Sequence, residues 1–187
     1  MSSRWLFVAL AGLVAIGSAE PAAAFERDTH YYATFALALT SCFDWQEAHL
    51  IASADVMVDG SRGTVAELDP ASRHNKAGWH AFGHSAERYY ELWERVTLEE
   101  GVAERLIVFG QFLHYLQDWE AHAGYPVHLG HAKATLLGHD PDSLANSEAR
   151  TRHAVQATLE HMALVCEQLG RLPEHIENPD EALSLIH

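Results

Sequence analysis

The segment from residue 101 to residue 122 has the clearest helical pattern in this chain. Its apolar residues Leu106, Phe109, Leu113 and Leu116 recur at intervals of three and four, as on one face of an α-helix. No segment shows the sustained alternation of apolar and polar residues that is typical of a strand. The sequence therefore predicts an all-α protein.

Weaker helical patterns and two long breaks complete the predicted fold. The further helices are expected over residues 28–40, 45–58, 79–95 and 144–169. The segments 60–75 and 124–141, rich in Gly, Pro, Ser or Asp, lie between them, and loops of that length are usually functional. With 187 residues in all, we expect a single-domain bundle of about five helices whose two long loops contribute to a metal site.

The first 24 residues have the pattern of an export signal. Arg4 precedes an apolar run, residues 5–16, that is too short to span a membrane, and small residues follow at 22–24. We expect cleavage after Ala24, which leaves Phe25 as the first residue of a metal-binding domain over residues 25–187. An uncleaved anchor is the alternative. No later stretch approaches transmembrane length, so an exported protein is predicted.

The charge balance and the histidine count limit the classes of function. There are 26 acidic and 12 basic side chains, a formal net charge of −14, which disfavours a stable complex with nucleic acid. The 14 histidines outnumber lysine and arginine together, and imidazole is the commonest metal ligand in proteins. Cys42 and Cys166 are too few for a cysteine zinc site. They either pair in an oxidising compartment or stay as two buried thiols.

His114, Asp118 and His122 are spaced four residues apart within the strongest predicted helix. Residues four apart lie on one helix face, where imidazoles and a carboxylate can bind one metal ion, or two if the carboxylate bridges. The alternative is a carboxylate beside two surface imidazoles. Large apolar residues fill most other positions of the segment, which favours an inward-facing polar stripe and hence a metal site.

Further candidate ligands lie near the predicted new N-terminus, at the end of the second helix and in the two long loops. Each alone is more often a surface residue, and only their convergence favours a site. They are Phe25 through its amine, His30, Asp55, Asp59, His74, His80, His131, His139 and Asp142.

Three segments together resemble the zinc-dependent phospholipase C superfamily, which includes the single-strand-specific zinc nucleases. They are FERDTH from Phe25, IASADVMVD ending at Asp59, and FLHYLQDWEAH ending at His122. The resemblance implies a secreted all-α enzyme with a trinuclear zinc site. It places the amine and carbonyl of Phe25, and then His30, on one zinc ion.

The same resemblance implies that Asp118 is a bridging carboxylate paired with His114, and that His122 and His131 are the next ligands. A little-characterised bacterial branch of the superfamily is more similar still. Its features appear here as His30-Tyr31-Tyr32, Val58-Asp59, the His114/Asp118/His122 trio, and Gly130-His131 with His139, Pro141 and Asp142. The likeness covers most of residues 25–142.

The resulting expectation is an exported hydrolase that uses two or three zinc ions to attack a phosphoester, in a small molecule or a phospholipid. Zinc lowers the pKa of its bound water to about 7, and Asp59 or Asp55 would orient that water or act as general base. The alternative is a non-catalytic, exported metal-binding protein that uses the same ligands. A helical His139-Asp140 dyad is disfavoured, because Pro141 biases Asp140 away from helical angles.

Overall fold

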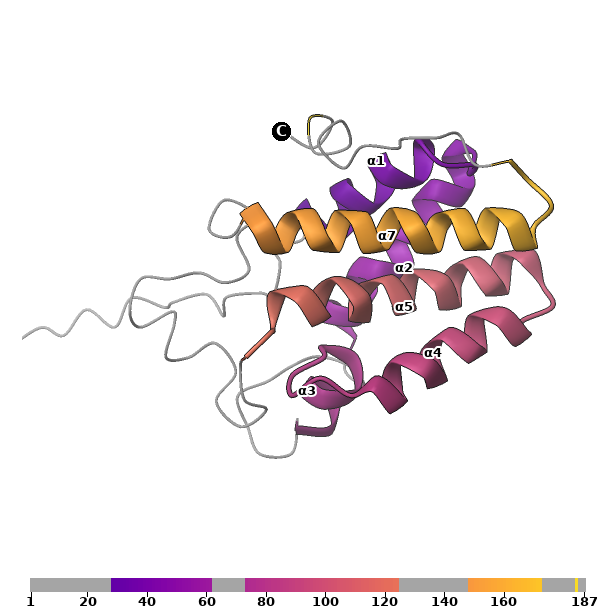
Figure 1. Cartoon of the computed structure of the whole chain (residues 1–187). Helices are drawn as coiled ribbons and strands as arrows, with labels where there is room; N and C mark the ends of the chain where they lie inside the picture. Colours follow the sequence, from indigo (N-terminus) through magenta and orange to yellow (C-terminus); the bar gives the residue numbers. More distant parts are fainter. Residues whose placement is uncertain (1–27, 62–72, 125–147, 173–183, 185–187) are drawn as a thin grey trace, which may run out of the picture.

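The computed structural model describes residues 28–61, 73–124, 148–172 and Ser184, and within these residues it contains helices and no strand (Figure 1). The all-α, single-domain prediction is confirmed. The elements are the π-helix η1 (Asp28–Ala33) and the α-helices α1 (Thr34–Leu39), α2 (Trp45–Gly60), α3 (Arg73–Trp79), α4 (Ala86–Leu98), α5 (Val102–Ala121) and α7 (Glu148–Gln168).

Helix α5 is the centre of the bundle. It packs against α2, α4 and α7, and Figure 1 shows it lying between α7 and α4. The apolar stripe seen in the sequence is buried: Leu106, Phe109 and Leu113 are at most 1% exposed. Burial continues into the polar residues of its C-terminal half, including His114 and Asp118. The predicted polar stripe of α5 therefore does face the interior.

Local signals explain where several helices begin and end. Asp44 caps α2 by accepting hydrogen bonds from the backbone of Gln46 and Glu47, and Glu47 bonds back to the Asp44 amide. Ser85 caps α4 by accepting from the Arg88 amide. Gly170, with φ of 69°, follows α7 in the left-handed conformation that glycine adopts without strain.

A disulfide and an ion pair hold the same corner of the bundle. Cys42, after α1, is bonded to Cys166 in the last turn of α7, so the pairing left open by the sequence is formed. Arg171 makes a two-pronged contact with Glu47, at 2.5 and 2.7 Å. A disulfide is typical of proteins from oxidising compartments. None of the helices in the described ranges combines the length and the apolar character that crossing a membrane requires.

The helix predicted over residues 79–95 is confirmed only from Ala86 onward. Helix α3 ends at Trp79, a turn follows, and α4 begins only at Ala86. Ala81 and His84 have φ values of 49° and 46°, which break the helix although neither residue is glycine. Helix α3 also occupies the end of the predicted loop 60–75, and the predicted helix 28–40 begins as a π-helix.

Candidate metal centre

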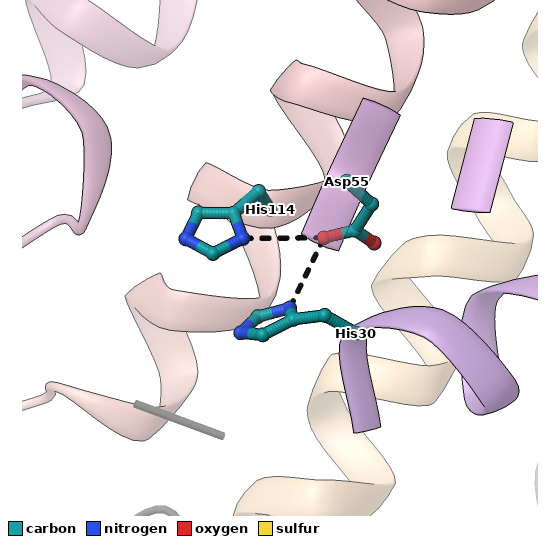
Figure 2. Close-up of side chains that lie close together, drawn as sticks. All are labelled: His30, Asp55 and His114. Atoms are coloured by element: carbon teal, nitrogen blue, oxygen red, sulfur yellow. Dashed lines mark hydrogen bonds and ion pairs between the residues drawn. The ribbon is translucent and has the colours of Figure 1, made fainter. Parts of the chain in front are cut away.

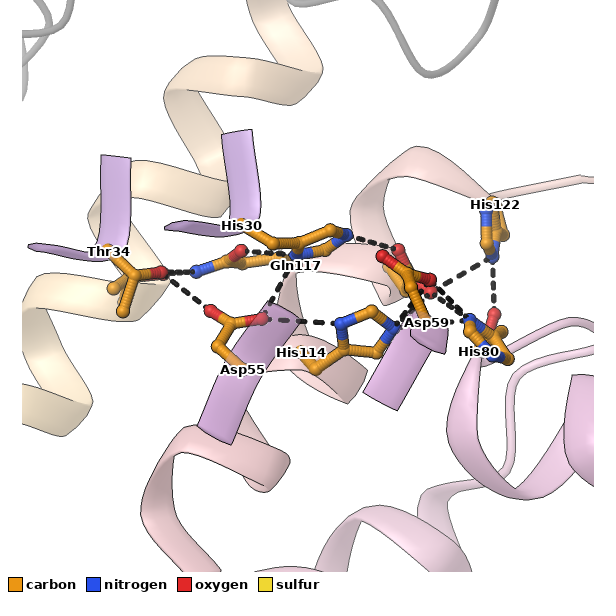
Figure 3. Close-up of polar contacts among 10 residues, drawn as sticks. His30, Thr34, Asp55, Asp59, His80, His114, Gln117 and His122 are labelled. Atoms are coloured by element: carbon orange, nitrogen blue, oxygen red, sulfur yellow. Dashed lines mark hydrogen bonds and ion pairs between the residues drawn. The ribbon is translucent and has the colours of Figure 1, made fainter. Parts of the chain in front are cut away.

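Two groups of histidine and aspartate side chains share His114. His30, Asp55 and His114 form the first group (Figure 2), and Asp59, His80 and His114 form the second (Figure 3). Within each group the facing nitrogen and oxygen atoms all lie within 4.8 Å of one another. Such donors bind zinc and similar divalent ions.

Asp118 of α5 joins the second group as a fourth donor. We call Asp59, His80, His114 and Asp118 the four-donor cluster. The two histidines and Asp118 are at most 1% exposed, whereas the Asp59 side chain is 17% exposed. Asp59 is therefore the most exposed member of the four-donor cluster.

The facing atoms of the four-donor cluster have the separations of ligands around a single ion. His114 Nε2 lies 3.1 Å from His80 Nδ1 and 3.2 Å from Asp118 Oδ2. Asp59 Oδ1 lies 3.6 Å from the same His114 nitrogen and 3.7 Å from His80 Nδ1. His80 Nδ1 and Asp118 Oδ2 are 3.0 Å apart. Donors about 2.0–2.1 Å from a tetrahedral zinc ion are about 3.3–3.4 Å from one another, and these five separations of 3.0 to 3.7 Å are close to that size.

Two carboxylate oxygens of the four-donor cluster have capacity to bind a cation. Asp59 Oδ2 is buried, and no described residue donates a hydrogen bond to it. Asp118 Oδ1 is also buried without a well-formed hydrogen bond, and it faces His30 Nε2 at 3.4 Å. A buried carboxylate oxygen with so little compensation is unfavourable. A bound divalent ion would supply the missing compensation for these two oxygens.

Helical spacing supplies the donors in pairs. Asp55 and Asp59 are four residues apart in α2, and His114 and Asp118 are four residues apart in α5. Residues at this spacing lie one above the other on a helix face, so each helix presents two donors in line. The contact between α2 and α5 brings the two pairs face to face.

Gly110 allows that contact to be close. It lies in α5 one turn before His114. A Cβ atom built on it would overlap the backbone oxygen of Ile51 and lie 2.7 Å from the Cβ of Ala54. Only glycine lets the two backbones approach to this distance.

The turn between α3 and α4 carries His80 and is held against the end of α5. His122 Nδ1 makes a short hydrogen bond to the backbone oxygen of His80, so this ring nitrogen is the donor. The Phe82 ring stacks on His122 with centroids 3.9 Å apart, and His84 stacks on Trp119 at 4.6 Å. These contacts offset the strain of two positive φ angles and fix the position of His80.

A second set of polar residues lies behind the four-donor cluster. We call His30, Thr34, Asp55 and Gln117 the outer network. The Thr34 hydroxyl donates to Asp55 Oδ2 at 2.6 Å and accepts from Gln117 Nε2 at 2.8 Å. His30 Nδ1 lies 2.9 Å from Gln117 Oε1 and 3.1 Å from Asp55 Oδ1. The outer network is therefore a closed ring, and Asp55 connects it to His114.

Burial and charge shift the pKa values of these groups in opposite directions. Burial raises the pKa of Asp59 overall. For Asp118, burial also acts upward, but the charges of His122 and His114 hold its pKa well below the usual value. Burial lowers the pKa of His30, yet Asp55 and Asp118 raise it well above 6.5. In the ion-free protein, protons on the histidines thus offset the buried carboxylates.

The structure brings many of the predicted site residues together. The two groups contain His30, Asp55, Asp59, His80 and His114. Asp118 and His122 lie beside them. His122 Nδ1 is directed at a backbone oxygen and is 3.8 Å from Asp118 Oδ2. His74 lies in α3. The remaining predicted ligands lie outside the described residues: Phe25, His131, His139 and Asp142.

Sequence reasoning missed Thr34, Gln117 and Phe82. Thr34 is four residues after His30, and Gln117 is three residues after His114, so both share a helix face with a predicted ligand. That spacing is a signal in the sequence, but hydroxyl and amide side chains are not usual zinc ligands. No sequence pattern indicates the stack of Phe82 on His122.

Comparisons with protein-family models, with curated proteins and with solved structures found no significant match for this chain. A functional assignment therefore rests on the residues of the site.

Proposed function

We propose that this chain is an exported, zinc-dependent hydrolase of phosphoester bonds. The observation that carries the proposal is the set of facing donor atoms in the four-donor cluster, with five separations between 3.0 and 3.7 Å. Imidazole nitrogens with carboxylate oxygens suit zinc better than calcium or magnesium, which prefer oxygen alone. The resemblance to zinc-dependent phospholipases C and nucleases supports the phosphoester as the bond attacked.

Asp118 is suited to hold two ions. Its Oδ2 faces the two histidines of the four-donor cluster, while its Oδ1 faces His30 Nε2 at 3.4 Å. A carboxylate with an imidazole nitrogen near each oxygen can bridge two metal positions. His30 and the amine of Phe25, whose placement is an expectation from the resemblance alone, would complete the second position.

Asp59 is the residue best placed to handle the attacking water. Its side chain is 17% exposed, the most of the four, while its Oδ2 is itself buried and has no hydrogen-bond donor among the described residues. That oxygen can orient a water molecule and accept its proton. A zinc ion held by the four-donor cluster would lower the pKa of a nearby water to about 7 and would polarise the phosphoryl group.

Charge restricts where an anionic substrate can bind. With a net charge of −14, the protein repels phosphate over most of its surface. A dication next to Asp59 reverses this locally, so a small phosphoester or a phospholipid headgroup would bind at the exposed side of the cluster. The resemblance to zinc-dependent phospholipases C and nucleases is the basis for proposing these substrates.

The test combines metal content with hydrolysis. We expect protein beginning at Phe25, purified without chelator, to contain zinc and to hydrolyse bis(p-nitrophenyl) phosphate. His114→Ala should lose both properties, because it removes the nitrogen that lies 3.1 Å from His80 Nδ1 and 3.2 Å from Asp118 Oδ2. His153→Ala is the matched control, since His153 is 72% exposed on α7. Zinc-free protein, or equal activity in the two variants, would contradict the proposal.

A non-catalytic zinc protein is the second candidate, and one observation favours it. The four-donor cluster already offers four protein donors, as structural zinc sites do, whereas catalytic sites usually keep a position for water. The same assay separates the candidates. Tight zinc binding without hydrolysis of any of a panel of phosphomonoesters, phosphodiesters and phospholipids would support the second.

A further inference from the structure

Asp55 is a buried carboxylate that faces two histidines at once. It lies in α2, is 0% exposed, and its Oδ1 is 3.1 Å from His30 Nδ1 and 3.2 Å from His114 Nδ1 (Figure 2). Its other oxygen accepts a hydrogen bond from the Thr34 hydroxyl. All of these contacts direct donors toward the carboxylate, so Asp55 is well compensated without an ion of its own.

The outer network determines which histidine nitrogens carry a proton. An ionised carboxylate only accepts hydrogen bonds, so each facing Nδ1 donates. His30 Nδ1 has a second acceptor, Gln117 Oε1, at 2.9 Å. This contact also requires the proton to be on Nδ1. The amide orientation of Gln117 is fixed in turn, since its Nε2 donates to Thr34. One pattern of donors and acceptors therefore satisfies the whole ring.

A proton on Nδ1 leaves Nε2 as the lone-pair nitrogen of the neutral ring. His114 Nε2 then faces Asp118 Oδ2 at 3.2 Å within the four-donor cluster. His30 Nε2 faces the other oxygen, Asp118 Oδ1, at 3.4 Å. The two lone pairs set by Asp55 thus point at the two sides of Asp118.

We propose that Asp55 is a positioning residue that fixes the tautomers of His30 and His114 together, and thereby links two zinc positions on either side of Asp118. The inference rests on the proposed zinc site and deepens it. Carboxylates that orient metal-bound histidines in this way typically contribute about 10–100-fold in metal affinity. Here one carboxylate serves two histidines, so its loss affects both positions.

The competing reading makes Asp55 a ligand, with an ion held by the Nδ1 atoms of His30 and His114. The geometry disfavours it. A neutral imidazole has one lone pair, and His114 Nε2 already faces His80 Nδ1 and Asp118 Oδ2 in the four-donor cluster. Binding ions through both nitrogens would require the ring to lose both protons.

The decisive measurement is the nitrogen state of the two histidines in zinc-loaded protein. Long-range ¹H–¹⁵N spectra distinguish a protonated nitrogen from a metal-bound one. We expect Nδ1–H with zinc on Nε2 for both His30 and His114. Metal bound to Nδ1 of either ring would overturn the inference, because Asp55 would then be competing with the ion rather than orienting the ring.

Zinc affinity in variants provides the second readout. In Asp55→Asn we expect affinity to fall about 10–100-fold at both positions, measured by competition with a chromophoric chelator. Unchanged affinity, or loss of one position with the other intact, would refute a shared role. If Asp55→Asn does not fold, Thr34→Val tests the same network, because it removes the hydrogen bond to Asp55 Oδ2.

Thr158→Val is the matched control for Thr34→Val. Both threonines are at most 1% exposed and both lie near Gln117 Nε2, at 2.8 Å for Thr34 and 3.5 Å for Thr158. We expect Thr34→Val to weaken zinc binding several-fold and to broaden the His30 and His114 signals, with Thr158→Val like the wild type. Equal behaviour of the two variants would count against the inference.

These outcomes are separable from failure of the proposed function. Wild-type protein that binds no zinc contradicts both proposals. Zinc bound with the expected tautomers but no phosphoester hydrolysis removes the catalytic proposal and leaves the role of Asp55 standing. Hydrolysis that persists with unchanged zinc affinity in Asp55→Asn removes the role of Asp55 alone.

Discussion

Gly110 of α5 lies directly against the backbone oxygen of Ile51 in α2, with no space for a methyl group between them. This contact sets the distance between the helices that carry Asp55, Asp59, His114 and Asp118. The geometry of the metal centre thus depends on a residue with no polar side chain.

Gly110→Ala should damage both stability and zinc binding. The added methyl group forces α2 and α5 apart, and overpacking of this kind costs about 1–3 kcal/mol. We expect a lower free energy of unfolding in denaturant and weaker zinc binding. Gly78→Ala in α3 is the control, because a Cβ there meets no atom within 4 Å. A fully zinc-competent Gly110→Ala protein would show that the close approach does not set the site.

His114 should make the stability of the ion-free protein depend on pH. Burial and the charge of His30 lower its pKa, but Asp118 and Asp59 raise it overall, from 6.5 to about 9. Because the folded-state pKa is the higher one, the contribution is complete below pH 6.5 and is lost as the pH rises through about 9. With chelator present, His114→Gln should therefore destabilise the protein more at pH 6 than at pH 9.5. Denaturant unfolding at both values measures the difference, and an equal loss would contradict the raised pKa.

Zinc binding should release protons, for the same electrostatic reason. A ligating imidazole nitrogen must be deprotonated, and the pKa values of His30 and His114 are raised in the ion-free protein. We expect zinc affinity to increase between pH 6 and pH 9. Calorimetric titration in buffers of different ionisation enthalpy counts the protons released at pH 7, and a count near zero would be the contrary result.

The Cys42–Cys166 disulfide should contribute to stability without defining the zinc site. It closes a loop with a sequence separation of 124 residues, and removing a native disulfide typically costs about 2–5 kcal/mol. We expect Cys42→Ser/Cys166→Ser to unfold at a lower temperature and to retain its zinc stoichiometry. The ratio of zinc to protein, by elemental analysis of the folded variant, checks the second part. A loss of zinc below the unfolding temperature would mean that the cross-link shapes the centre.

Phe82 should support zinc binding through the turn that carries His80. Its ring stacks on His122, whose Nδ1 bonds to the His80 backbone. Phe82→Leu removes the stack, and we expect zinc affinity to fall about tenfold, the lower end of outer-shell effects. Phe35→Leu is the control, because the Phe35 ring contacts Tyr31 and Trp45 instead. Equal zinc affinity in the two variants would assign Phe82 to packing alone.

The parts of the fold that follow from periodic burial could be predicted from the sequence. Helix α5 has large apolar residues at helical spacing, and these are buried as expected, with His114 and Asp118 on an inward face. The same criterion placed the start of the next helix too early, at residue 79 instead of Ala86. Phe82, Tyr89 and Leu92 fit a helical face, yet positive φ angles at Ala81 and His84 end the helix. Contacts with α5 stabilise those angles, and a local sequence pattern does not reveal such contacts.

The candidate site could be predicted in its donors but not in its arrangement. Spacing of four identified the pairs in α2 and α5, because one helix fixes the geometry within each pair. The pairing of the helices depends on Gly110, which carries no chemical signal in the sequence. A donor can face the ion, or it can orient another side chain, as Asp55 does. The difference depends on sub-ångström placement of its atoms, which a sequence does not contain.

The division of the four-donor cluster between distant segments also governs when an ion can be captured. An unfolded chain offers only fragments, such as His114 with Asp118, and two donors hold an ion far less firmly than four. If the cluster binds an ion as proposed, strong binding begins only after α2 has docked on α5 and the turn carrying His80 has reached its place. The identity of the bound ion would then depend on the compartment in which the chain folds, because that compartment supplies the ions available to the completed cluster.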